Sequence, residues 1–240
     1  MLTNVIERFL RLIYPNRCLL CNKIISGKYF CSDCAGQVAP IKIKTCPDCG
    51  LVMSDCACKF YFYYFDEIVS CFEGSDNAKK AFYSFKFYGN YLGYKYFADE
   101  MVNRIKSKMT VIDFDFITAV PSHRSNKSTR DYDPVYAMAR YISKRVKLPF
   151  KRVLYQPNMV LKQHEAETFE QRYQNVKNKY KIKKSAKIKG KSVLLIDDIK
   201  TTGATLSECA RELKLAGAKT VIVASALTIP SKKRKEKINN

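Results

Sequence analysis

Two adjacent carboxylates end an apolar run in the last quarter of the chain. In residues 193–206, VLLIDDIKTTGATL, Asp197 and Asp198 come directly after four apolar residues. Such a run is typical of a strand buried in a parallel sheet, and these sheets bind ligands beyond the carboxyl ends of their strands. The residues that follow open a helix, so we expect their backbone N–H groups to hold an anion at the positive end of the helix dipole. These turn residues are Lys200, Thr201, Thr202, Gly203, Ala204 and Thr205.

This combination of residues suits a ribose 5-phosphate. Threonine hydroxyls add donors for a phosphate, and Gly203 lets the backbone come close to it. Asp197 and Asp198 can accept hydrogen bonds from the vicinal hydroxyls of a sugar. The stretch lacks the Gly-Lys-Ser/Thr of a Walker loop and the G-x-G-x-x-G of a dinucleotide site. The alternative, in which the carboxylates only cap a helix, accounts for one of them and not for both.

A cysteine-rich segment lies in the first quarter of the chain. Eight of the ten cysteines fall within residues 18–58, in four pairs with one or two residues between partners. Thiolates at this spacing form knuckles, and two knuckles complete a tetrahedral zinc site of the structural type. A disulfide scaffold, the alternative, would need an oxidising compartment. The sequence therefore predicts two structural Zn²⁺ sites. In sequential pairing, one site consists of Cys18, Cys21, Cys31 and Cys34, and the other of Cys46, Cys49, Cys56 and Cys58. A pairing in which the two groups interleave is also possible.

Basic residues outnumber acidic residues by 43 to 22, which gives a formal charge of +21. An excess of this size favours a polyanionic partner such as nucleic acid. Residues 171–196 contain no acidic side chain, and residues 177–191 contain eight lysines. This lysine run is either a nucleic-acid surface or a solvated face of the protein.

The length suits one medium domain with a small appendage. We expect an N-terminal helix and a zinc-binding module in residues 1–58, an α/β domain in 59–230 and a basic tail in 231–240. The N-terminal helix either packs on its own protein or anchors it to a membrane surface. No segment reaches the roughly 18 apolar residues of a membrane span, so we expect no transmembrane segment and a cytoplasmic protein.

Hydrophobic periodicity predicts the remaining elements. Strand and helix alternate near the end of the chain and make a βαβ unit, so the predicted class is α/β with a parallel sheet. Residues 60–97 hold sixteen of the thirty aromatic residues, which either stack on single-stranded bases or form the core. Isolated Cys71 and Cys209 are expected to be buried apolar residues. The expected strands are 66–74, 114–121, 192–198 and 219–227, and the expected helices are 76–89, 93–108, 134–146 and 203–217.

The stretch at residues 193–206 resembles the 5-phosphoribosyl-1-pyrophosphate (PRPP) signature of type I phosphoribosyltransferases. Together with the multi-cysteine segment, it makes the chain similar to the ComF family of competence-associated proteins. This resemblance implies a type I phosphoribosyltransferase-like parallel sheet flanked by helices, plus a small Cys-rich zinc module. Further matching pieces are FKFYG at residues 85–89, VPSHR at 120–124, Gln163, and the R-x-x-N of Arg172 and Asn175.

The resemblance also implies roles for individual residues. Asp197 and Asp198 are the expected catalytic pair on the ribose hydroxyls, and residues 201–205 form the 5′-phosphate loop. Mg²⁺ would bridge pyrophosphate and ribose oxygens, and residues 163–172 resemble a flap over PRPP. The chain departs from the family pattern at Asp131 and Asp133, which bring negative charge near the pyrophosphate, and at Ile199-Lys200. The residues implied for pyrophosphate are Ser122, His123 and Arg124, with Arg130 retained nearby.

Two functions follow from the resemblance. The first is a phosphoribosyltransferase that moves the ribose 5-phosphate of PRPP to a nitrogen acceptor. The second is a DNA-uptake factor that binds single-stranded DNA beside a helicase-like partner, with PRPP as a regulatory or vestigial ligand. A zinc-linked scaffold without a ligand is a third possibility. His123 and His164 can also be plain surface histidines.

Overall fold

The computed structural model describes residues 15–56, 58, 62–87, 93–121, 133–157 and 169–230. The expected N-terminal helix and the basic tail lie outside these residues. Among the helices in the described ranges, none has the length and apolar character that crossing a membrane requires.

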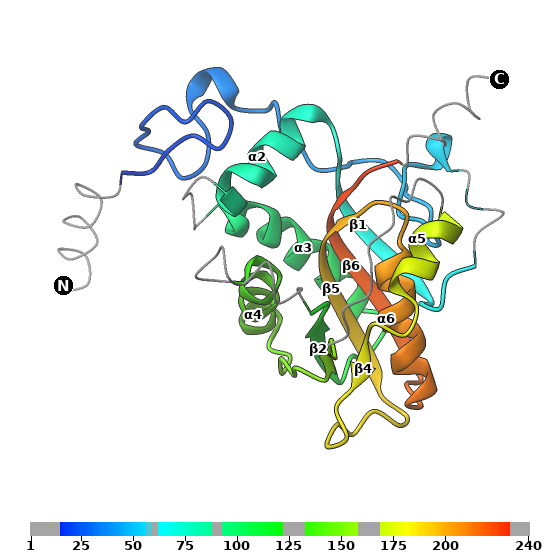
Figure 1. Cartoon of the computed structure of the whole chain (residues 1–240). Coiled ribbons are helices and arrows are strands. Elements are labelled where there is room, and N and C mark those ends of the chain that lie inside the picture. The colour runs from blue at the N-terminus through cyan, green and yellow to red at the C-terminus, as the bar shows by residue number, and fades with distance from the viewer. Residues whose placement is uncertain are drawn as a thin grey trace, which may run out of the picture.

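A four-stranded parallel sheet forms the centre of the fold (Figure 1). Its strand order is β1-β6-β5-β2, and all three neighbouring pairs run parallel. This confirms the predicted class. The expected strand at 192–198 continues to residue 200, because Ile199 and Lys200 still pair with Leu227 and Thr228. The strands are β1 (Glu67–Glu73), β2 (Phe116–Ala119), β5 (Ser192–Lys200) and β6 (Thr220–Thr228).

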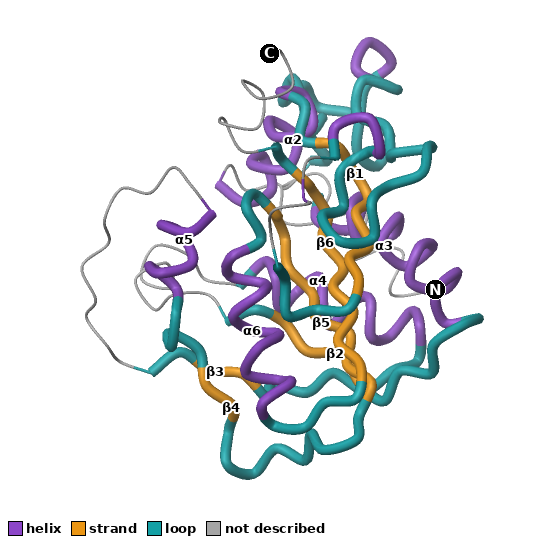
Figure 2. The backbone as a smooth tube through the Cα atoms, turned by 90° about the vertical axis from the view of Figure 1, so that its right-hand side faces the viewer, coloured by secondary structure: helices purple, strands orange, loops and turns teal. Residues whose placement is uncertain are grey.

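Helices cover both faces of this sheet (Figure 1). On one face lie α2 (Asp76–Phe87), α3 (Tyr94–Met109) and α4 (Pro134–Val146). On the other face lies α6 (Ala204–Leu215), with α5 (Phe169–Val176) packed against it (Figure 2). These helices match the four expected ones, and α5 is additional.

Side chains of β5 alternate between the two faces, as the twofold repeat of a strand requires. Leu194 and Ile196 belong to the hydrophobic cluster shared with α2, α3 and α4. Val193 and Leu195 belong to the cluster shared with α6. All four are at most 1% exposed. A strand covered on both faces explains why the sequence at this point is continuously apolar.

Three aromatic residues of α2 and α3 are core residues. Phe82, Phe85 and Phe97 have no exposed surface, and their rings contact one another at centroid distances of 4.7–5.9 Å. Rings buried in this way cannot stack on bases, so the base-stacking alternative is wrong for these three. Cys71 and Cys209 are also fully buried, as expected.

A second, two-stranded sheet joins segments far apart in the sequence. Strand β3 (Leu154–Tyr155) pairs antiparallel with β4 (Lys181–Ile182). The pairing places part of the lysine run beside residues 151–153, and it holds the segment that leads from α5 to β5.

Candidate functional site

A pocket of about 390 Å³ lies where β5 ends and α6 begins. All six residues of the predicted ligand-binding turn line it, together with Asp197 but not Asp198. The position agrees with the rule that parallel sheets bind ligands beyond the carboxyl ends of their strands. Its lining consists of Arg172, Asn175, Val176, Lys179, Asp197, Ile199, Lys200, Thr201, Thr202, Gly203, Ala204, Thr205 and Leu206.

Asp197 and Asp198 lie near the carboxyl end of β5, shortly before the loop. Asp197 is 8% exposed, and Asp198 is half-buried. Oδ1 of Asp197 accepts a hydrogen bond from the Asp198 N–H at 2.9 Å, and Oδ1 of Asp198 accepts one from the Ile199 N–H at 2.7 Å. These bonds fix the two carboxylates. Gly203 is the N-cap of α6, so the alternative in which the aspartates cap that helix is wrong.

The loop after the carboxylates, residues 201–205, is called the phosphate loop below. Gly203 has φ +85°, a left-handed conformation that favours glycine. From this position its carbonyl accepts the N–H of Ser207 at 2.8 Å and starts α6. Thr202 is 7% exposed, and its hydroxyl accepts the Ala204 N–H at 3.4 Å. The loop therefore opens directly into the N-terminus of a twelve-residue helix, which favours negative charge.

Lys200 lines the pocket with the rest of the predicted anion-binding turn. It is also the last residue of β5 and only 1% exposed. Its carbonyl accepts the Ile229 N–H at 2.8 Å. The phosphate loop therefore begins at Thr201, because the strand ladder with β6 extends through residue 200.

Helix α5 supplies residues on the other side of the pocket. Nη1 of Arg172 donates a hydrogen bond to Oγ1 of Thr201 at 3.1 Å. Asn175 also lines the pocket, three residues further along the same helix. The i, i+3 spacing of R-x-x-N places both on one helical face. Lys179 in the lysine run lines the pocket too, and no signal in its spacing identified it in advance.

A buried carboxylate fastens the α5 segment to α6. Glu208 has no exposed surface, and its oxygens accept hydrogen bonds from the Asn178 N–H at 2.7 Å and the Tyr173 hydroxyl at 3.2 Å. Arg211 forms an ion pair with it at 2.7 Å. Burial raises the pKa of Glu208, but Arg211 and the other donors outweigh burial and hold that pKa below its usual value. Burial and the Glu208 charge raise the pKa of Tyr173 to about 12.

Several predicted site residues lie outside the described residues: Ser122, His123, Arg124, Arg130 and Asp131, together with Gln163 and His164. Asp133 is described, and it has a structural role. Its Oδ1 accepts the N–H groups of Val135 and Tyr136, both at 3.1 Å, so it is the N-cap of α4. This accounts for an aspartate at a position where the family pattern has a different residue.

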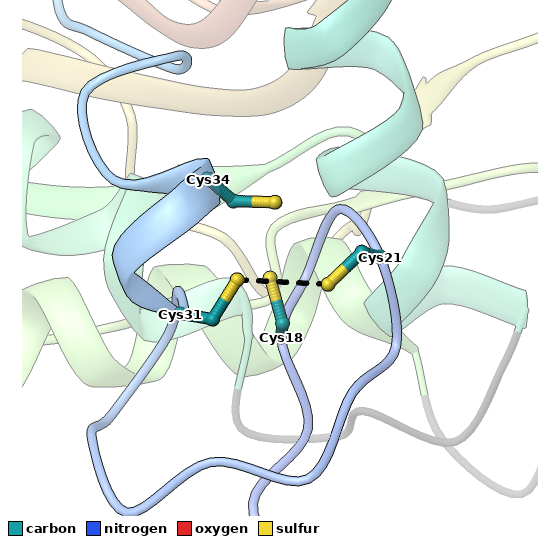
Figure 3. Close-up of side chains that lie close together, drawn as sticks. All are labelled: Cys18, Cys21, Cys31 and Cys34. Carbon is teal, nitrogen blue, oxygen red and sulfur yellow. Dashed lines mark hydrogen bonds between the residues drawn. The ribbon is translucent and has the colours of Figure 1, made fainter.

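The first cysteine cluster consists of Cys18, Cys21, Cys31 and Cys34 (Figure 3). Its four sulfur atoms lie within 4.8 Å of one another, and those of Cys21 and Cys31 are 3.6 Å apart. Thiolates around one Zn²⁺ at about 2.3 Å are roughly 3.8 Å apart, so this geometry fits zinc. Burial raises the pKa of Cys18, but N–H groups of neighbouring residues outweigh it and lower that pKa to about 6.

The second cysteine cluster consists of Cys46, Cys49, Cys56 and Cys58. Sulfur separations of 3.3–3.7 Å again suit one Zn²⁺. They are far longer than the roughly 2.05 Å of a disulfide bond, and all ten cysteines are free thiols. The predicted sequential pairing is therefore confirmed, and the interleaved and disulfide alternatives are wrong.

The two clusters pack against different faces of the sheet. Cys18 and Cys34 belong to the hydrophobic cluster on the side of α2, α3 and α4. Cys46, Cys49 and Cys58 belong to the cluster on the side of α6. The second cluster is thus on the side of α6, whose first residues line the pocket. In Figure 1 the segments that carry the two clusters lie at opposite sides of the sheet.

Two known families match separate parts of the chain. Residues 134–239 match the phosphoribosyl transferase domain, and residues 9–61 match the double zinc ribbon domain. The fold is thus a type I phosphoribosyltransferase-like parallel sheet flanked by helices, with two zinc-ribbon-like clusters of cysteines. No curated protein matches the chain.

Solved structures give a weaker likeness. An adenine phosphoribosyltransferase is 14% identical over 64% of this chain and 76% of its own, with a TM-score of 0.41. A glutamine PRPP amidotransferase from B. subtilis is 21% identical over 54% of this chain, with a TM-score of 0.37. An allosteric regulatory enzyme of purine biosynthesis is 21% identical over 54%, with a TM-score of 0.36. The chain spans about a quarter of the last two, 26% and 25%. Likenesses of this size do not specify a function.

Proposed function

We propose that the chain is a ComF-like protein that binds PRPP, or a related ribose 5-phosphate, together with Mg²⁺ in the cytoplasm. The observation that carries the proposal is the shared pocket of Asp197, the phosphate loop and Arg172. It combines carboxylate acceptors, a helix N-terminus and a guanidinium within one cavity. A sugar phosphate with vicinal hydroxyls needs all three.

Each group has a role in this proposal. Asp197 and Asp198 accept hydrogen bonds from the 2′- and 3′-hydroxyls of the ribose. Thr201, Thr202 and Thr205 donate to the 5′-phosphate with the backbone N–H groups beside them. Arg172 neutralises part of the phosphate charge. Ser122, His123, Arg124 and Arg130 remain the predicted contacts of the pyrophosphate.

Carboxylate oxygens at the end of β5 suit Mg²⁺, which prefers oxygen ligands and usually also binds phosphate oxygens of the substrate. Asp197 and Asp198 are the described residues that would hold it near the ribose. When bound, the ion would neutralise charge on the pyrophosphate.

The reaction we propose is phosphoribosyl transfer, within the broader role in natural competence that the ComF resemblance implies. The bond between C1 of the ribose and pyrophosphate oxygen breaks, and a bond from C1 to the acceptor nitrogen forms. Pyrophosphate leaves with the electron pair, and the acceptor nitrogen loses a proton. No side-chain nucleophile is needed, so catalysis rests on positioning and on electrostatic stabilisation.

Isothermal titration calorimetry with PRPP and Mg²⁺ tests the proposal. The doubly substituted variant Asp197→Asn/Asp198→Asn should lose at least about tenfold in affinity, because charge-assisted hydrogen bonds contribute roughly 1.5–3 kcal/mol. Asp115→Asn is a matched control, since Asp115 pairs with Lys191 outside the pocket. Equal affinity in the two variants would refute the assignment of the carboxylates.

A second candidate, binding of single-stranded DNA, is favoured by a separate basic pocket of about 300 Å³. Lys151, Arg152, Lys183 and Lys187 line it, from two segments that the β3–β4 pairing brings together. Arg152 is held with its guanidinium carbon 4.1 Å from the ring centroid of Tyr136. A helicase-like protein is the partner expected with this function.

The DNA candidate is tested by salt dependence. Lys183→Ala/Lys187→Ala should reduce the slope of log affinity against log salt by about 1.4, because each contact with a phosphate of single-stranded DNA contributes about 0.7 through counterion release. The control Lys106→Ala/Lys144→Ala removes two exposed lysines from α3 and α4. If the lysine run is only a solvated face, the salt dependence of DNA affinity should change by the same small amount in both variants.

A further inference from the structure

Two residues shortly before β1, Tyr63 and Tyr64, contact the phosphate loop and the start of α6. Tyr63 is 8% exposed, and its hydroxyl donates to the carbonyl oxygen of Thr202 at 3.1 Å. The next residue, Tyr64, donates its backbone N–H to Oγ of Ser207 at 3.1 Å. Both bonds reach the turn that starts α6. The ring of Tyr63 stacks on Phe65 at 4.8 Å with 15° between planes, which holds the phenol in place.

Lys200 lies beneath the same loop. Its Nζ is 5.8 Å from the ring centroid of Tyr63, within cation–π range. A Cβ added at Gly203 would lie 2.9 Å from Cε1 of Tyr63 and 3.2 Å from Cε of Lys200. The loop backbone thus rests directly on these two side chains.

A second route ties the second cluster to Lys200 through the sheet. The N–H of Ile68 in β1 donates to the carbonyl of Pro47, between two ligands of the cluster, at 2.8 Å. Oγ of Ser70 in β1 is 2.6 Å from Oγ1 of Thr228 in β6. Thr228 is in turn the register partner of Lys200. The second cluster is therefore connected through β1 and β6 to Lys200, at the end of β5 where the loop begins.

We propose that Tyr63 and Lys200 are positioning residues of the phosphate loop, through which the zinc-loaded second cysteine cluster sets the geometry of the sugar-phosphate site. The proposal rests on the proposed function for its ligand. Cys46, Cys49 and Cys58 belong to the same hydrophobic cluster as Tyr63, which links the second cysteine cluster to the ring that supports the loop. The first cysteine cluster belongs to the core on the opposite face of the sheet and serves as an internal comparison.

Tyr63→Phe is the most specific test, because it keeps the stacked ring and removes the hydroxyl that holds Thr202. Tyr64→Phe is the matched control, since it removes the same group from a ring that is 37% exposed. Two quantities are measured on the full zinc-loaded chain: affinity for PRPP with Mg²⁺ by calorimetry, and amide hydrogen exchange of residues 201–207 without ligand. Tyr63→Phe should bind about tenfold more weakly and its loop amides should exchange about tenfold faster, as the loss of a buried hydrogen bond predicts.

Lys200→Met is the second variant, because it keeps an unbranched stem against Gly203 and removes the charge. It should also bind about tenfold more weakly, with zinc content unchanged. The proposal is overturned if loop amides exchange at the same rate in Tyr63→Phe and Lys200→Met as in Tyr64→Phe. It is also overturned if Tyr63→Phe and Lys200→Met change the melting temperature but neither PRPP affinity nor loop exchange. If the unmodified chain does not bind PRPP, the proposed function fails, and the exchange measurement alone then decides whether these residues position the loop.

Discussion

The side chain of Arg172 in α5 donates a hydrogen bond to the hydroxyl of Thr201 in the phosphate loop across 3.1 Å. This contact joins two segments that are 29 residues apart in the sequence. It brings a guanidinium into the pocket that Asp197 also lines.

Arg172→Gln should weaken PRPP binding by about ten- to a hundredfold, because a hydrogen bond from a charged donor contributes roughly 1.5–3 kcal/mol. Calorimetry with PRPP and Mg²⁺ measures the loss. Arg145→Gln is the control, since Arg145 lies in the last turn of α4 and contacts the Tyr141 ring. Similar losses in the two variants would mean that general positive charge, and not the position of Arg172, attracts the ligand.

Gly203→Ala should reduce both stability and ligand binding. A left-handed conformation costs a residue other than glycine about 1 kcal/mol, and the new Cβ would also meet Tyr63. Gly190→Ala is a close control, because Gly190 has φ +74° but has nothing within 4 Å of a new Cβ. Chemical denaturation should show a lower free energy of unfolding for both variants, whereas calorimetry should show weaker PRPP binding only for Gly203→Ala. Normal binding by Gly203→Ala would contradict the tight fit of the loop.

Loss of one zinc should affect the pocket in a cluster-dependent way. Cys56→Ser and Cys21→Ser each remove one ligand, from the second and first clusters respectively. Metal analysis should show about one fewer Zn²⁺ for each variant, since a structural site needs four ligands. Affinity for PRPP should fall severalfold more in Cys56→Ser, because the second cluster shares a core with Tyr63, which contacts the phosphate loop, and the first cluster does not. Equal effects would argue that the clusters serve stability alone.

Glu208→Gln should destabilise the fold at neutral pH by about 3 kcal/mol, as expected when one partner of a buried ion pair is removed. The pKa of Glu208 is lowered in the folded state, so its contribution is complete above the unfolded pKa of about 4.3 and is lost as pH falls through the lower folded value. The free energies of unfolding of the two proteins should therefore converge as the pH falls from the unfolded pKa through the lower folded pKa of Glu208. A constant difference at every pH would show that Glu208 acts by packing and not by charge.

Local sequence predicted the elements that carry the site. Asp197, Asp198 and Gly203 follow a continuous apolar run, and the structure places them at the end of β5 and the start of α6. The cysteine spacing likewise predicted two zinc-type clusters, because each knuckle forms within a few residues of chain. Short-range patterns of this kind depend on neighbours in the sequence, so the folded chain shows the structure that they predict.

Relationships between distant segments could not be predicted in this way. The contact of Arg172 with Thr201 depends on how α5 packs on α6, which the buried Glu208 determines. The burial of Lys200 depends on pairing with β6 and on Tyr63, neither of which is a neighbour in sequence. A lysine at the end of an apolar run gives no local sign that it will be buried.

³¹P NMR of PRPP with Mg²⁺ and the zinc-loaded chain is the most direct test of whether a sugar-phosphate site lies at the end of β5, with Asp197→Asn/Asp198→Asn as the comparison. We expect the unmodified chain to broaden the PRPP signals or to convert PRPP to free pyrophosphate, and the doubly substituted variant to do neither. PRPP signals that stay sharp and unchanged with the unmodified chain, or that change equally with both proteins, would contradict a sugar-phosphate site at the end of β5.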